Sequence, residues 1–167
     1  FYRAVNKVHP SFIRVEADEA TYNLHIMLRF ELEMAMIDGS VGIEKLPQEW
    51  NERFESYLGI VPPTDTLGVL QDVHWSMGLV GYFATYALGT MLSAQYYRKA
   101  VEERPSIPHD IASGRIDTLL TCKNENIHIH GRKFTGDELT RRLTGEGIQS
   151  KYYTEYLQKK YGELYGL

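Results

Sequence analysis

One stretch decides the fold class: residues 17–38 read ADEATYNLHIMLRFELEMAMID. This long run is rich in apolar residues, and Gly39 follows it where a C-cap glycine would end a helix. We therefore predict a helix over residues 17–38. Because the run is apolar almost all round, we expect the helix to be buried, and the charges within it to need partners.

The same helical pattern continues along most of the chain. Pro47 stands where a first-turn proline opens a helix, and Trp50, Phe54 and Leu58 follow four residues apart on one face, ending at Gly59. The prolines at 62 and 63 predict an extended linker before a short turn. A further helix is predicted over residues 81–103, closed by Pro105 and Pro108. Others are predicted over residues 115–128, 135–145 (opened by a capping box) and 150–164.

Evidence for strands is weak. Residues 39–43 are the only place to look for a short β-hairpin, and no internal repeat or low-complexity stretch is present. The sequence therefore predicts a mainly α fold with at most one short hairpin. We expect residues 1–167 to form a single helical segment.

Composition and charge exclude some classes of protein. The chain has 167 residues, a net charge of −4 and no long basic stretch, which argues against nucleic-acid binding. Cys122 is the only cysteine, so no internal disulfide can form, as fits a cytoplasmic protein. The chain begins with Phe1 and resembles neither a signal nor a transit peptide, so we expect either a piece of a longer protein or loss of a short leader.

Residues 75–97 carry no formal charge and are long enough to span a bilayer. The stretch also contains serines, threonines, a glutamine and three glycines, and no aromatic belt flanks an aliphatic centre. We therefore expect a helix buried in a helical protein and no membrane insertion.

The six histidines do not form the zinc motif H-E-x-x-H, and no nucleophile elbow, P-loop or dinucleotide-binding motif is present. His128 and His130 are two apart, which on a helix points them to different sides. Exposed histidines near a helix end are a commoner explanation of this pair than metal binding. We predict no metal ligand within the chain.

A polar stretch, residues 13–22, precedes the long apolar run. Arg14, Asp18 and Tyr22 are four apart and would form one polar face on a helix. They fit a solvated helix start, with acids near its positive end. They also fit a buried arginine held by acids, which is suited to binding a carboxylate with two parallel hydrogen bonds.

Residues 72–76 and 81–89 read DVHWS and GYFATYALG. Tyr82 and Tyr86 are four apart and would face the same way on a helix. Histidine and tyrosine can donate hydrogen bonds to an oxyanion, so His74 and the tyrosines are candidates for peptide hydrolysis. Packing of the rings in a core is the commoner use of such residues, and both interpretations stay open here.

These two stretches resemble the M32 family of metallocarboxypeptidases. Residues 13–22 are similar to its signature I-R-x-x-A-D-E-x-T-Y, and residues 81–86 to G-Y-F-P-T-Y, with Ala84 in place of the proline. Residues 9–12 (HPSF), 74–76 (HWS), 130–133 (HGRK) and the closing residues 161–167 (YGELYGL) also resemble the family, in the same order. The resemblance covers essentially the whole chain.

The resemblance implies a helical, long-cleft zinc metallopeptidase fold, of which this chain is the C-terminal part. It implies a zinc-dependent carboxypeptidase that acts on peptides, is cytoplasmic and is commonly a homodimer. Arg14, with Asp18, would bind the C-terminal carboxylate of the substrate. His74 would contact the substrate or the developing oxyanion, and Tyr86 or Tyr82 would stabilise that oxyanion, Tyr86 being favoured.

The zinc ligands of the family are expected upstream of Phe1, so the resemblance implies that this polypeptide alone hydrolyses nothing. The alternative is a non-catalytic helical interaction module that descends from such an enzyme. Such a module has no need of Arg14, His74 and Tyr86 together, so their presence favours the enzyme.

Overall fold

Helix α2, Glu19–Ile37, is the longest helix of the first half of the chain and confirms the predicted helix, with a start two residues later. Asp18 is extended, and its carboxylate accepts the backbone N–H groups of Ala20 and Thr21, so Asp18 is the N-cap. Gly39 has φ +79°, the left-handed conformation that ends a helix without strain.

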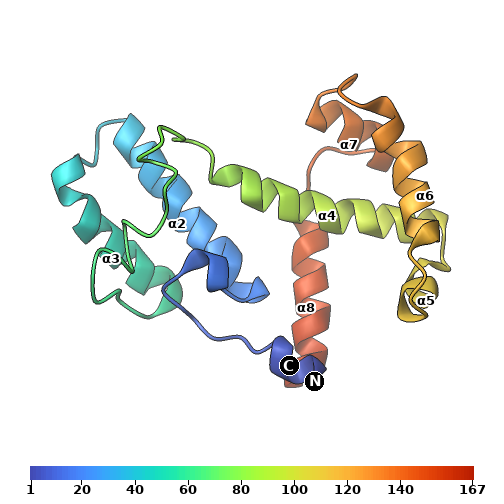
Figure 1. The fold of residues 1–167 in the computed structure, drawn as a ribbon, viewed down its shortest axis with the longest axis horizontal. Helices are drawn as coiled ribbons and strands as arrows, with labels where there is room; N and C mark the ends of the chain where they lie inside the picture. The colour runs from blue at the N-terminus through green and yellow to red at the C-terminus, as the bar shows by residue number, and fades with distance from the viewer. The chain divides into compact units, whose positions relative to one another are not determined.

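The computed structural model describes residues 1–167 and contains helices and no strand (Figure 1). The fold is therefore mainly α, as predicted. The chain forms two compact units, Phe1–Ala87 and Leu88–Leu167. The remaining elements are α1 (Tyr2–Val5), η1 (Arg14–Glu16), η2 (Ile43–Lys45), α3 (Leu46–Leu58), α4 (Ala84–Glu103), α5 (Ile107–Ala112), α6 (Asp117–Asn126), η3 (His128–His130), α7 (Gly136–Thr144) and α8 (Lys151–Tyr165). That the chain is one segment of a larger catalytic domain stays a prediction.

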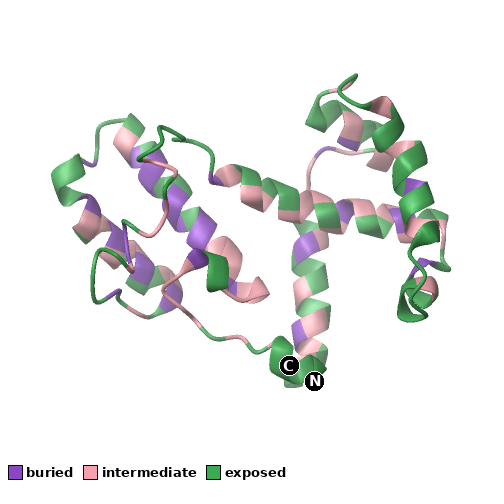
Figure 2. Ribbon diagram, viewed as in Figure 1, coloured by how far each residue is buried: buried purple, intermediate pink, exposed green.

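The core of the first unit lies between α2 and α3, where the buried residues of the two helices face each other (Figure 2). Trp50, Phe54 and Leu58 are all buried, which confirms the predicted apolar face of α3. Pro47 lies in the first turn of α3 and Gly59, φ +71°, ends it. The other core members are Leu28, Leu32, Ala35, Val41, Leu46 and Val69.

One expectation for this unit was wrong. The outer face of α2 is not buried within the chain, since Met27, Phe30, Met34 and Ile37 are 46%, 45%, 51% and 68% exposed. Residues 39–43 form a turn that leads into η2, and no hairpin forms. The turn is fixed because the N–H of Val41 bonds to the carbonyl of Ala35, which closes the end of α2 instead of pairing with a strand.

The second unit matches the prediction in its later helices. The side chain of Thr135 accepts from the N–H of Glu138, and Glu138 bonds back to the N–H of Thr135, so the predicted capping box of α7 is present. α8 falls within one residue of its predicted ends. The sequence prediction missed α5, because Pro108 lies in the first turn of that helix, where proline is tolerated, and does not break it.

Helix α4 begins three residues later than predicted. Gly81 has φ +86°, and the N–H groups of Thr85 and Tyr86, at the start of α4, bond to the carbonyls of Tyr82 and Phe83. Only Gln95 and Ala100 of α4 are buried, so the helix is more exposed than expected. None of the helices in the structure combines the length and apolarity that crossing a membrane requires.

Candidate functional site

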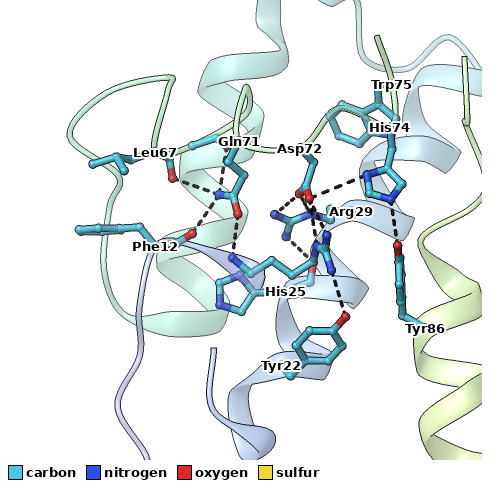
Figure 3. A network of polar contacts seen from close by, with 12 residues as sticks. Phe12, Tyr22, His25, Arg29, Leu67, Gln71, Asp72, His74, Trp75 and Tyr86 are labelled. Carbon is cyan, nitrogen blue, oxygen red and sulfur yellow. Dashed lines mark hydrogen bonds and ion pairs between the residues drawn. The ribbon is translucent and has the colours of Figure 1, made fainter. Parts of the chain in front are cut away.

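The first unit brings together the segment around Arg14, the turn that ends at Asp72, and His74 and Tyr86 (Figure 3). Arg14 and Asp72 are 58 residues apart in sequence, so the fold of α2 and α3 between them creates the cluster. Tyr82, the other predicted tyrosine, lies at its edge and is 45% exposed.

Arg14 opens η1 and is buried, with 6% of its side chain exposed. Its Nε and Nη2 donate to the same oxygen, Oδ1 of Asp72, at 3.1 and 2.7 Å, and its Nη1 donates to the Tyr22 hydroxyl at 3.0 Å. Burial lowers the pKa of Arg14, but the hydrogen bond and charge of Asp72 outweigh burial and leave that pKa raised. Arg14 is therefore a permanently charged group in a largely dry position.

Arg29, fully buried on α2, holds the other oxygen of Asp72. Its Nε and Nη2 lie 2.7 and 2.6 Å from Oδ2, and its Nη1 donates to the carbonyl of His25 at 2.8 Å. Its guanidinium lies over the rings of Trp50 and Phe83, at 4.6 and 5.3 Å from their centroids. Burial lowers the pKa of Arg29 to about 10 against the opposing charge of Asp72, so Arg29 stays protonated at neutral pH.

Asp72 is thus one carboxylate shared by two guanidinium groups. Burial alone would raise the pKa of Asp72, but hydrogen bonds and charge from Arg14 and Arg29 leave it below its usual value. The three side chains together carry a formal charge of +1. Glu33, a buried carboxylate on α2, accepts a hydrogen bond from Trp75 Nε1 at 3.0 Å.

Gln71 fixes the two segments that carry Arg14 and Asp72. Its Oε1 accepts the backbone N–H of Arg14 at 2.9 Å, and its Nε2 lies 2.9 Å from the carbonyl of Phe12. The same Nε2 also lies 3.0 and 3.1 Å from the carbonyls of Leu67 and Gly68. The side-chain amide therefore joins the start of η1 to the turn of residues 67–71 through backbone groups alone.

His74 connects the charged cluster to the tyrosines. Its Nε2 lies 3.0 Å from the hydroxyl of Tyr86, and its Nδ1 lies 3.9 Å from Asp72 Oδ1, too far for a hydrogen bond. That Nδ1 is buried and has no hydrogen-bond partner. Tyr82 contacts His74 only through its ring, with the centroids 5.7 Å apart, and Phe83 packs against His74 at 4.4 Å.

Asp18 lies differently from what the sequence suggested. Residues 14–18 are not one helix, because η1 ends at Glu16 and Ala17 and Asp18 are extended. Asp18 Oδ1 accepts the N–H groups of Ala20 and Thr21, each at 3.0 Å, and Oδ2 accepts the Thr21 hydroxyl and the N–H of His9. Both oxygens are thus engaged in capping α2, and Arg14 is held by Asp72.

Sequence reasoning missed Gln71, Asp72 and Arg29 as members of the site. Arg29 carried a usable signal, since a charged residue within an apolar run must find a buried partner. Its partner could not be identified, because several acids lie at unrelated distances along the chain. Gln71 gave no signal, since its contacts are all to backbone groups.

The residues of this chain do not form a metal site. No three histidine, cysteine, aspartate or glutamate side chains are grouped so that they could hold an ion. His128 and His130 lie in η3, and His128 Nδ1 is 2.7 Å from the Oδ1 of Asn124. The candidate site therefore offers a buried guanidinium beside a histidine–tyrosine pair, which suits an anion and an adjacent polar group.

Comparisons with known proteins place the chain among the metallocarboxypeptidases. It belongs to the M32 family, since the family model described as Carboxypeptidase Taq (M32) metallopeptidase matches residues 1–161. The chain is 44% identical over 165 residues to Carboxypeptidase 1 of Bacillus subtilis, covering 99% of this chain and 33% of the relative. It is 45% identical over 166 residues to Thermostable carboxypeptidase 1 of Thermus thermophilus, covering 99% of this chain and 32% of that relative.

The solved structures agree with this assignment. The M32 carboxypeptidase from Deinococcus radiodurans R1 superposes with a TM-score of 0.97 at 44% identity, over 99% of this chain and 34% of that one. The chain thus spans about a third of the length of the relatives that it matches.

Proposed function

We propose that this chain supplies the substrate-carboxylate and oxyanion-binding half of a zinc-dependent carboxypeptidase that releases C-terminal amino acids from peptides. The observation that carries the proposal is the buried, charged Arg14 in the same cluster as the His74–Tyr86 pair. A guanidinium binds a free carboxylate with matched geometry, and the carbonyl of the terminal peptide bond lies close to that carboxylate in any peptide.

In this proposal Arg14 binds the C-terminal carboxylate of the peptide, while His74 and Tyr86 face the carbonyl that is attacked. Tyr86 is favoured over Tyr82 as the oxyanion donor, because its hydroxyl is positioned by His74 at 3.0 Å. Tyr82 packs its ring against that of Tyr86, with the centroids 5.5 Å apart, and supports its orientation. Asp18 contributes by capping α2 and so fixing the start of the helix that carries Arg29.

Zinc would have to be held by residues outside 1–167, because the side chains of this chain do not fit a metal site. It follows from the proposal that the 167-residue chain alone hydrolyses nothing. Release of an amino acid from a peptide by purified chain, stopped by a chelator, would contradict this.

The role of Arg14 is tested in the full polypeptide, by which we mean the longest natural polypeptide that contains residues 1–167. Arg14→Ala should raise KM for peptides with a free carboxylate, because the charged hydrogen bonds to the substrate are lost. Binding of C-terminally amidated peptides should be unchanged. Arg98→Ala is the matched control, since Arg98 is exposed and its ion pair is with Glu102 on its own helix.

The role of Tyr86 is tested by comparing Tyr86→Phe with Tyr82→Phe in the same polypeptide. Loss of one oxyanion donor lowers kcat by about 10²- to 10³-fold, with a much smaller change in KM. We expect that loss for Tyr86→Phe and a small effect for Tyr82→Phe. If Tyr86→Phe lowered kcat and raised KM by similar factors and also lowered the melting temperature, Tyr86 would have a structural role instead.

The proposal extends to assembly and location, where we expect a cytoplasmic homodimer. Light scattering of the full polypeptide tests the dimer, and cell fractionation tests the location. The competing function, a non-catalytic interaction module, would be favoured if Arg14→Ala and Tyr86→Phe both left peptide hydrolysis unchanged.

A further inference from the structure

Asp72 Oδ1 is saturated in the cluster as it stands. A carboxylate oxygen offers about two lone pairs, and Arg14 Nε and Nη2 both donate to this one atom. His74 Nδ1, the next polar atom along, lies 3.9 Å from the same oxygen and is buried without any partner. A buried ring nitrogen without a hydrogen bond lowers the stability of the fold. His74 Nδ1 and Asp72 Oδ1 are therefore two groups that could bond but lie too far apart in this arrangement.

Arg14 can be withdrawn from Asp72 without leaving that carboxylate unpaired. Arg29 holds Oδ2 through Nε and Nη2 at 2.7 and 2.6 Å, and Arg29 is itself fixed by the His25 carbonyl. The contact of Arg14 with Asp72 is made to one oxygen only, whereas a peptide carboxylate would offer two. Two parallel bonds make a stronger pair than two donors sharing one atom.

We infer that Asp72 is a positioning residue. When a ligand carboxylate binds Arg14, Asp72 Oδ1 gives up its hydrogen bonds from Arg14 and accepts one from His74 Nδ1. The movement required is small, since Oδ1 must approach Nδ1 by roughly 0.7 Å to reach hydrogen-bond distance. Asp72 pivots about the oxygen that Arg29 retains. His74 then carries its proton on Nδ1 and donates a hydrogen bond from Nδ1 to Asp72 Oδ1. Its Nε2 stays directed toward Tyr86.

The consequence is that recognition of the carboxylate sets the orientation of the His74–Tyr86 pair. Five charged or titratable groups surround His74: Asp72 from its own segment, Tyr82 and Tyr86 from the start of α4, and Arg14 and Arg29 through Asp72. Of these, Asp72 is the only acceptor close to Nδ1. This inference rests on the proposed role of Arg14 and extends it to a residue that touches neither the ligand nor the reacting atoms.

The test follows the tautomer of His74 by nitrogen NMR in the full polypeptide with labelled histidine, the His74 signal being assigned from its loss in His74→Gln. The probe is a dipeptide analogue with a methylene in place of the scissile carbonyl, compared with its C-terminal amide. We expect the carboxylate form to place the ring proton of His74 on Nδ1, and the amide form to leave the tautomer unchanged.

Two variants separate this exchange from a simple effect of charge. In Arg14→Gln, Oδ1 has lost its competitor, so His74 should show the Nδ1–H tautomer without any ligand. In Asp72→Asn, the ligand should no longer change the tautomer. Arg14→Gln keeps Asp72 paired with Arg29, so it provides the test even if Asp72→Asn does not fold.

The outcomes distinguish this inference from the proposed function. If the carboxylate binds more tightly than the amide but the His74 tautomer does not change, the exchange is refuted and the role of Arg14 stands. An Nδ1–H tautomer already present in the ligand-free wild type refutes it as well. If the carboxylate binds no more tightly than the amide, both the role of Arg14 and the exchange fail.

Discussion

Acidification should destabilise the first unit through His25. This residue lies on α2, is fully buried, and has no hydrogen-bond partner at either ring nitrogen. Burial, followed by the charges of Arg29 and Arg14, lowers the pKa of His25 to about 4, against smaller opposing effects from Asp72 and Asp18. The folded protein therefore keeps His25 neutral at pH values where the unfolded chain has already protonated it.

The magnitude follows from the difference between the two pKa values. The unfolded value is 6.5 and the folded value about 4, so the unfolded chain binds more protons between these limits and stability falls as pH falls through them. At 1.36 kcal/mol per pKa unit, the loss reaches about 2 kcal/mol at pH 5 and about 3 kcal/mol at pH 4. The lowered carboxyl pKa values, as at Asp72, act at lower pH, since the reference pKa of Asp72 is 3.8.

The assay is urea unfolding of the 167-residue chain from pH 7.5 to 5, followed by the fluorescence of its two tryptophans, Trp50 and Trp75. With an m value of about 2 kcal/mol per molar, the midpoint should fall by about 1 M over this range because of His25. His25→Leu should remove that part of the change, and His9→Gln, at an exposed position, should retain it. If His25→Leu shows the same dependence on pH as the wild type, the reasoning is wrong.

Three further changes test the packing and capping of the two units by urea unfolding. Phe54→Ala should cost about 3 to 5 kcal/mol, because a fully buried ring is lost from the core; a loss under 1 kcal/mol would contradict the described core. Gln95→Leu should cost about 1 to 3 kcal/mol, since the buried amide bonds Thr144 and two backbone groups; an unchanged midpoint would contradict this. Thr135→Ala should cost about 1 kcal/mol and Thr135→Ser much less, because serine also accepts the N–H of Glu138; equal losses would argue against the cap.

Local signals predicted most of the helices. Gly39, Gly59 and the capping box at Thr135 each act within a few residues, so their consequences are visible in the sequence. The prediction was wrong where two local rules compete. Pro108 can break a helix or open one, and the sequence alone does not show that it lies in the first turn of α5.

The site was predicted only in part. Arg14, His74 and Tyr86 were identified, and the structure brings them into one cluster. The spacing placed Asp18 on one helix face with Arg14, whereas the carboxylate that holds Arg14 lies 58 residues away, at Asp72. Spacing rules describe neighbours on one helix, and they cannot report pairs that the packing of α2 on α3 creates.

The contacts of Gln71 have a consequence for recombination between relatives. Its amide bonds only main-chain atoms, at Phe12, Arg14, Leu67 and Gly68, so the side chain of residue 12 can change without breaking the junction. A hybrid with a crossover between residues 15 and 66 would inherit its two parts from different parents. We expect such a hybrid to keep this junction whenever the later parent contributes a glutamine at position 71, whatever the earlier parent carries at position 12.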